Sequence, residues 1–459
     1  MLKEKIRARL LKLISQNREL ILNTANYIWK NPETGFREWK TSGYMAKQFK
    51  ALGYKPVLMK GIPGFYADLD TGRPGPLLAV LGELDSIICA SHPEADPETG
   101  AVHACGHHTQ CAYLLGAAAV LKDSEILASL SGKIRFIAVP AEELIELEFR
   151  STLREQGLIK YIGGKVEFLH RGVFDNASAA IMLHSGGSSE KPITIYNGNN
   201  GCLTKNITYS GKAAHAGGAP HRGTNALYAA ALGINAINAI RETFKEDNFT
   251  RVHPIMTEGG TAVNVIPDLA KLESFVRGAS PEAIVEENKK VNRALAGAAL
   301  SMGAGLRIMD IPGYMPLHNN PDLNKLARKA GDAIFGKSKV KFLKEWKAGS
   351  TDMGDLSCVM PVLHPSGGGG KGTAHGNDYS IANMETACID STHFITAMVC
   401  NLLGAGAESL KKIKESHKPI FKNYRAYFDF IDALYSDREL ISYDVNEDGS
   451  RQDKASVIW

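Results

Sequence analysis

The sequence of 459 residues lacks a long hydrophobic run, an excess of one charge and any paired-cysteine spacing. Its longest apolar stretch, from Ala112 to Leu121, is about half of the roughly 18 residues that a membrane-spanning helix needs. The net charge is only +4 and no long run of one sign occurs. Neither a nucleic-acid nor a membrane-surface partner is therefore expected. Charged residues also interrupt the apolar positions of the N-terminal segment, which does not fit a secretory signal.

The cysteines are few, and their spacing does not indicate disulfide or metal-binding pairs. There are seven, an odd number, and none has the two-residue spacing typical of redox or zinc motifs. In a chain of this size, that pattern predicts reduced thiols and a cytoplasmic protein. Histidine forms a contrast, because three of the 14 histidines, His103, His107 and His108, lie within six residues of one another.

Short apolar runs separated by helical segments predict an α/β fold. The runs are Pro76–Leu84, Lys133–Pro140 and Ala179–Leu183. Near-continuous apolar strands are typical of a mixed, mostly parallel sheet covered by helices on both faces. The three runs end at Asp85, at Glu142-Glu143 and at His184. Because ligands gather at the carboxyl ends of parallel strands, these side chains are expected to lie together.

The middle of the chain has a different order of helices and strands. Its order of expected elements is β-α-β-β-α-β, which predicts an inserted two-layer α+β domain of ferredoxin-like type. The expected strands are Cys202–Ser210, Val252–Thr257, Val263–Arg277 and Leu306–Ile311, and the expected helices are Thr224–Phe244 and Pro281–Met302. We therefore expect a catalytic domain formed by residues 1–199 and 313–459, with 200–312 inserted. The aromatic tail beyond about Leu410 is expected to pack as a helix on the catalytic domain.

Two short motifs carry the expected chemistry. Cys105 and His107 flank a glycine before a helix, where a thiolate and an imidazole suit zinc, and imidazole with carboxylates also suits manganese. The same pattern also fits a buried thiol and a capping histidine. Glu142 and Glu143 can divide into a general base and a metal ligand, because a carboxylate near a metal-bound water can accept its proton. Acidic residues at the start of a helix are the alternative.

Two further histidines complete the expected metal site. His184 ends an apolar strand, a position that also suits a hydrogen-bonded core histidine, and His375 lies in a glycine-rich loop. Together with Cys105, His107 and Glu143 they make five ligands at one expected sheet edge. That number exceeds the needs of one tetrahedral ion and suits two ions that share a bridging ligand.

Several longer motifs extend this pattern. They are Asn31–Glu38, His103–His107, Pro140–Glu143, Ala214–Gly217, Gly223–Ala226 and Gly259–Asp268. With these motifs the chain resembles, to about residue 405, the aminoacylase and carboxypeptidase family of dinuclear metallohydrolases. It looks closest to the amidohydrolase branch that includes aminobenzoyl-glutamate and auxin-conjugate hydrolases.

The resemblance implies a role for each matched residue. The five ligands would hold two divalent ions, zinc or manganese, with Cys105 bridging them. Glu142 would act as general base and then general acid, while Asp85 would orient the ligands. The catalytic domain would be zinc-exopeptidase-like.

The resemblance also assigns the inserted domain, which would serve as lid and dimerisation domain of a homodimer. There, His215 and Asn264 would stabilise the tetrahedral oxyanion across the dimer interface, and Arg277 would hold the α-carboxylate of the substrate.

The chain departs from the branch at three places. His108 and Gln110 stand where relatives usually have aspartate and histidine. The segment between Glu143 and His184 is also long, which leaves His170 as a rival ligand to His184.

Together these features predict a cytoplasmic amidohydrolase that cleaves a small N-acyl amino acid, an aroyl-glutamate or a dipeptide. A metal-binding protein without turnover is one alternative, and a cysteine hydrolase that uses Cys105 is another. A zinc deaminase is disfavoured because the P-C-x-x-C element is absent.

Overall fold

The chain folds into two compact units. The computed structural model describes residues 4–184, 186–187, 190–445 and 451–457. The first unit comprises Met1–Gly198, Leu317–Trp346 and Thr351–Ile420, and the second comprises Asn199–Pro316, Lys347–Ser350 and Phe421–Trp459. Within the described residues, no helix has both the length and the apolar character needed to cross a bilayer.

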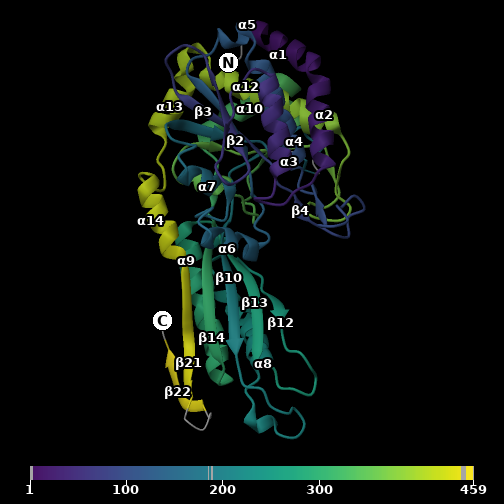
Figure 1. Cartoon of the computed structure of the whole chain (residues 1–459). Coiled ribbons are helices and arrows are strands. Elements are labelled where there is room, and N and C mark those ends of the chain that lie inside the picture. Colours follow the sequence, from purple (N-terminus) through teal and green to yellow (C-terminus); the bar gives the residue numbers. More distant parts are fainter. Residues whose placement is uncertain (1–3, 185, 188–189, 446–450, 458–459) are drawn as a thin grey trace. The chain divides into compact units, whose positions relative to one another are not determined.

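The first unit is built on a six-stranded mixed sheet (Figure 1). Its strands, in spatial order, are β1 (Val57–Leu58), β2 (Phe65–Asp70), β6 (Lys133–Val139), β3 (Leu77–Glu83), β7 (Ala177–Ile181) and β17 (Val362–Leu363). The last four run parallel, whereas β1 and β2 pair antiparallel. This arrangement confirms the predicted α/β fold with a mostly parallel sheet.

The central strands are buried on both faces. Successive residues of β3 from Leu78 to Leu81 have no exposed surface, as expected when helices cover a parallel sheet. Helix α4 (His107–Leu121) packs on β3, and α2 (Arg18–Trp29) and α12 (Ser391–Leu403) pack on α4. Because Glu83 at the end of β3 pairs with Val139 at the end of β6, the segments that follow both strands leave the sheet at one edge.

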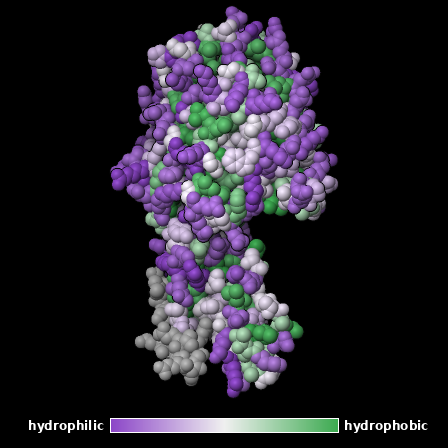
Figure 2. Space-filling view, in the orientation of Figure 1, coloured by the Kyte–Doolittle hydropathy of each residue, from purple (hydrophilic) through white to green (hydrophobic). Residues whose placement is uncertain are grey.

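The N-terminal segment forms two helices. Helix α1 (Glu4–Gln16) ends where the side chain of Asn17 donates a hydrogen bond of 2.8 Å to the backbone oxygen of Leu13, and α2 begins at Arg18. An asparagine side chain competes for backbone hydrogen bonds, which explains the break between the two helices. In the space-filling view, hydrophilic side chains cover much of the visible face, with smaller apolar areas among them (Figure 2).

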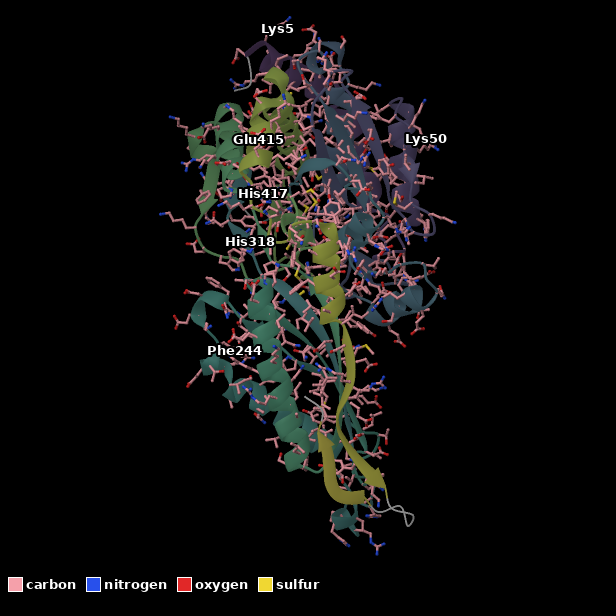
Figure 3. The ribbon with its side chains drawn as sticks, turned by 90° about the vertical axis from the view of Figure 1, so that its left-hand side faces the viewer. Lys5, Lys50, Phe244, His318, Glu415 and His417 are labelled. Carbon is pink, nitrogen blue, oxygen red and sulfur yellow. The ribbon has the colours of Figure 1, made fainter. Side chains whose placement is uncertain are left out.

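The second unit contains the predicted two-layer α+β domain of ferredoxin-like type. Strands β10 (Gly201–Ser210), β13 (Leu269–Gly278) and β14 (Gly305–Tyr314) are antiparallel, and β12 (Ile255–Glu258) pairs with β13. Helices α8 (Ala226–Ala239) and α9 (Pro281–Ser301) pack on this sheet, on the side where Figure 3 labels Phe244. Asn225 and Ser280 cap the two helices by accepting backbone hydrogen bonds. The inserted domain is thereby confirmed in its architecture.

The last part of the tail, from Phe421 onward, differs from expectation. Helix α14 (Tyr424–Leu434) and strand β21 (Ser436–Val445) belong to the second unit, not to the catalytic one. β21 pairs antiparallel with β14, and β22 (Arg451–Val457) pairs with β21. The prediction that the tail packs as a helix on the catalytic domain therefore holds for α13 (Glu408–Ser416), which packs on β7 and α12, and is wrong from Phe421 onward. Aromatic composition indicated burial of the tail but gave no signal for the sheet edge that it joins.

Candidate metal centre

The carboxyl edge of the first unit's sheet gathers the expected ligands. Asp85 follows β3, Glu142 and Glu143 follow β6, and His184 follows β7. Cys105 and His107 lie where a loop enters α4, which begins at His107 after Gly106 in a left-handed conformation (φ 87°). His375 lies in the loop between β19 (Gly370–Lys371) and β20 (Ser380–Ile381).

The ligand atoms form two groups that share the sulfur of Cys105. One group comprises Cys105, His107 and His184, and the other comprises Cys105, Glu143 and His375; within each group the ligand atoms lie within 4.8 Å of one another. Nε2 of His184 and Nε2 of His375 each lie 3.3 Å from Sγ of Cys105. Nε2 of His375 also lies 3.1 Å from Oε1 of Glu143.

This donor set fits two divalent cations. Sulfur, imidazole nitrogen and carboxylate oxygen are ligands of zinc and related ions. Burial raises the pKa of the Cys105 thiol well above its usual range, and the nearby charge of Glu143 raises it further. A thiolate at this position therefore needs a neighbouring cation. Burial acts to raise the pKa of Glu143, but the contacts with His375, His107 and Cys105 together outweigh it and lower the pKa to about 2.

Asp85 orients two of these ligands. Nδ1 of His107 donates to the backbone oxygen of Asp85 at 2.9 Å and lies 3.2 Å from its Oδ1. The other carboxylate oxygen of Asp85 accepts the backbone N–H of Glu143 at 2.8 Å. These contacts place the proton of His107 on Nδ1 and leave Nε2 to bind a metal. Asp85 thus lies where the family resemblance places an orienting carboxylate.

Glu142 is buried beside the two ligand groups. Burial raises its pKa well above the usual range, and the charges of Glu83 and Glu143 act in the same direction. A raised pKa makes the carboxylate a stronger base, which suits a residue that accepts a proton and later releases it.

A buried charge network beside Nε2 of His107 was missed by sequence reasoning. Oε2 of Glu83 lies 3.1 Å from Nε2 of His107 and accepts a 2.6 Å hydrogen bond from Gln110. Nζ of Lys165 lies 2.5 Å from Oε1 of Glu83 and also contacts the carboxylate of Asp352. The one available signal was an acidic residue at the end of an apolar strand.

Glu83, His107 and Glu142 form a further group of closely spaced ligand atoms. The ammonium of Lys165 already supplies the positive charge at this place, so the group is accounted for without a third ion. Since both carboxylates that Lys165 contacts are buried, the lysine neutralises charge that would otherwise be costly.

Sequence reasoning also missed two side chains, Glu38 and Arg150, that hydrogen-bond the backbone around Glu142 and Glu143. Glu38 is fully buried and accepts the backbone N–H of Ala141. Arg150, from helix α6 (Leu147–Glu155), donates to the backbone oxygens of Glu143 and Ile162. The long segment before His184 therefore contributes to the site through Arg150.

The remaining histidines of the expected region do not join the ligand groups of the described residues. His108 is buried, its ring lies 4.9 Å from that of Trp29, and burial lowers its pKa to about 3. His103 packs beside it, with ring centroids 5.5 Å apart. His170 is exposed at the end of α7 (Gly164–His170), where its ring contacts Tyr161. The structure thus brings His184, not His170, to Cys105.

The second unit carries the other three predicted residues. Nδ1 of His215 accepts the backbone N–H groups of Gly217 and Gly218, at 3.2 and 3.0 Å. The backbone oxygen of Asn264 accepts the N–H of Ala216, so Asn264 lies beside the His215 loop. Arg277 lies near the end of β13, one residue before Gly278.

The chain is similar to known hydrolases. Residues 197–301 match the family model described as the peptidase dimerisation domain. The Xaa-Arg dipeptidase of Mus musculus is 28% identical over 381 residues, which cover 79% of each chain. One subunit of the p-aminobenzoyl-glutamate hydrolase of Escherichia coli is 30% identical over 258 residues, or 54% of each chain.

The fold is also that of a solved relative. A dinuclear metal-binding peptidase from Bacillus subtilis aligns with a TM-score of 0.63 and 20% identity, over 86% of this chain and 99% of that one. These matches support the resemblance seen in the motifs: the chain is similar, over most of its length, to hydrolases and peptidases that act on amide bonds, and residues 197–301 match a peptidase dimerisation domain.

Proposed function

We propose that the chain is a cytoplasmic amidohydrolase that uses two divalent ions, zinc or manganese, to cleave a small substrate with a free carboxylate. The substrate would be an N-acyl amino acid, an aroyl-glutamate or a dipeptide. The observation that carries this proposal is the pair of ligand groups that share Cys105, with the buried Glu142 beside them. The relatives named for dipeptide and aminobenzoyl-glutamate hydrolysis support the substrate range.

Glu142 would move the proton that the reaction requires. When bound by Cys105, His107, Glu143, His184 and His375, the ions would supply Lewis-acid activation of water and of the amide carbonyl. Glu142 would accept a proton from the attacking water as the carbon–oxygen bond forms. It would then give that proton to the amide nitrogen as the carbon–nitrogen bond breaks, which releases the amine and restores the carboxylate.

Residues of the inserted domain would bind the substrate. Because Nδ1 of His215 accepts two backbone hydrogen bonds, its ring proton lies on Nε2 in the neutral form. That N–H would donate to the oxyanion, with the Asn264 amide as a second donor. Arg277 would bind the α-carboxylate, for which a planar guanidinium is suited.

We further propose a homodimer formed through this domain. Large apolar side chains are exposed on α8, on β12 and on the loop that follows β12. They are Tyr228, Leu232, Ile255, Met256, Val263 and Val265. Exposed apolar side chains of this kind can form an interface, and the match to a dimerisation domain supports this reading.

The test is a matched pair of variants. Glu142→Gln should keep its metals and lose nearly all turnover, whereas Glu148→Gln, at an exposed position of α6, should resemble the wild type. Metal content is measured on the same samples that are assayed against a panel of N-acyl amino acids and dipeptides. Wild-type turnover by Glu142→Gln would refute the assignment of the base.

The same panel separates the alternatives. Full metal content with no hydrolysis of any compound would favour a binding protein. A chelator should abolish activity, and added manganese or zinc should restore it. Activity that survives the chelator would instead favour a cysteine hydrolase.

A further inference from the structure

We infer that His253 and Ser350 are positioning residues that fix the guanidinium of Arg277 for end-on binding of a substrate carboxylate. This inference rests on the proposed function, because it concerns how Arg277 performs its proposed role. All the contacts lie within the second unit, to which the segment Lys347–Ser350 belongs.

Three neighbours hold the guanidinium of Arg277. Its Nε–H donates to Nε2 of His253 at 3.1 Å, and Nη1 donates to Oγ of Ser350 at 2.7 Å. The ring of Phe275, two residues earlier on β13, lies with its centroid 5.1 Å from the central carbon of the guanidinium. The same ring contacts His253 edge-on, with centroids 5.6 Å apart. The plane of the guanidinium is thus set by contacts on two edges and one face.

This arrangement leaves one edge for a ligand. A guanidinium has five N–H groups and binds a carboxylate in bidentate fashion either through Nε and Nη2 or through Nη1 and Nη2. His253 occupies Nε, so the first mode is blocked. Ser350 uses only one of the two hydrogens on Nη1. The remaining pair, on Nη1 and Nη2, suits a carboxylate that approaches end-on.

Arg277 also retains an uncompensated charge. Among the described residues no carboxylate pairs with it, although its guanidinium is always protonated near neutral pH. Both neighbours that hold it, an imidazole and a hydroxyl, are uncharged acceptors. The site is therefore arranged so that the first anion to neutralise Arg277 would be a ligand.

The arrangement requires neutral His253. Its Nε2 must accept a hydrogen bond, which places its proton on Nδ1. Partial burial lowers the pKa of His253, and the charges of Arg277 on β13 and of Arg241 on the short helix η2 (Arg241–Thr243) lower it further. At acid pH, protonated His253 would turn an N–H toward Nε of Arg277, and the two donors would repel each other.

The experiment compares two variants of His253. His253→Phe removes the acceptor, whereas His253→Gln keeps an oxygen that can accept the Nε–H. Exposed His170, in the first unit, gives the control His170→Phe. KM and kcat are measured for the fastest substrate of the panel and for its α-carboxamide, which lacks the negative charge, from about pH 5.5 to about pH 8.

The expected result is a selective change in KM. His253→Phe should raise KM for the carboxylate substrate about three- to tenfold, with kcat within about twofold and little effect on the carboxamide. In the wild type, KM for the carboxylate substrate should rise as pH falls through the pKa of His253. His253→Gln should keep a low KM that does not depend on pH in this range.

Three outcomes would overturn the inference: an unchanged KM in His253→Phe, equal effects on carboxylate and carboxamide, or a pH dependence that persists in His253→Gln. The variant Arg277→Met distinguishes a failure of the positioning role of His253 from a failure of the proposed function. If Arg277→Met raises KM and His253→Phe does not, only the positioning role fails. If neither variant changes KM, the proposed carboxylate anchor fails as well.

Discussion

Glu38 accepts, through Oε1, a 2.7 Å hydrogen bond from the backbone N–H of Ala141, the residue before Glu142. Ala141 has a left-handed backbone conformation, with φ of 56°. A residue other than glycine is strained in this region and stays there only when its surroundings hold it. Glu38 therefore stabilises the turn that presents Glu142 and Glu143 to the metal centre.

Glu38→Ala should disturb that turn. The variant leaves a buried N–H without its acceptor, so we expect a loss of unfolding free energy of about 2 kcal/mol. We also expect weaker metal binding, because Glu143 follows the turn. Urea unfolding and metal titration measure the two effects. Glu38→Gln keeps an acceptor oxygen and should lie closer to the wild type; equal losses in both variants would show that the acceptor is not the cause.

The sequence predicted the layers of the fold better than the ends of its elements. Apolar runs located β3, β6 and β7, because a strand buried on both faces leaves a continuous signal. The expected strand Val252–Thr257 is interrupted instead, since Pro254 lacks the N–H that a ladder needs. Likewise, β13 begins at Leu269, two residues after Pro267. Local backbone chemistry, which periodicity does not report, sets these ends.

Sequence reasoning predicted the metal ligands better than it predicted the buried residues that hold those ligands in place. His184 follows β7, and Cys105 precedes α4, which packs on β3. The loop of His375 joins them because its backbone N–H donates a 2.9 Å hydrogen bond to the backbone oxygen of Ala104. Lys165 and Asp352, by contrast, are 187 residues apart in sequence. No local pattern links such partners, and a lone lysine is normally read as a solvated side chain.

Lys165→Met should destabilise the first unit. The variant would leave Glu83 and Asp352 buried near each other without their cation. Removing one partner of a buried ion pair typically costs about 3 to 5 kcal/mol, and we expect a loss of that order in urea unfolding. We also expect weaker metal binding, because Glu83 contacts His107.

A double variant provides the control for this prediction. Lys165→Met combined with Asp352→Asn removes one of the two uncompensated carboxylates and should recover part of the lost stability. If the double variant is less stable than Lys165→Met by the full cost of Asp352→Asn alone, the two residues are not coupled, and the charge argument is wrong.

Asp390 should make stability depend on pH. Burial raises its pKa from 3.8 to about 6. The folded state thus binds the proton more tightly than the unfolded state, so stability falls as pH rises from about 4 to about 6 and stays lower above that. Asp390→Asn should therefore be more stable than the wild type at pH 7, by about 1 kcal/mol after allowance for solvent screening.

The gain should vanish below about pH 4, where both states of the wild type are protonated. Urea unfolding at several pH values measures this difference. Asp429→Asn, at a side chain that is 73% exposed, is the control and should show no such trend. A constant gain in Asp390→Asn at every pH would point to packing rather than to titration.

The tail should stabilise the second unit through β21. Ile441 on this strand is fully buried in the core of that unit and pairs with Leu306 of β14. Ile441→Ala should cost about 2 to 5 kcal/mol in the unfolding transition of the second unit. Glu439→Ala, at an exposed position of the same strand, should cost little. If both variants unfold like the wild type, β21 is not part of this core, and the tail must pack elsewhere.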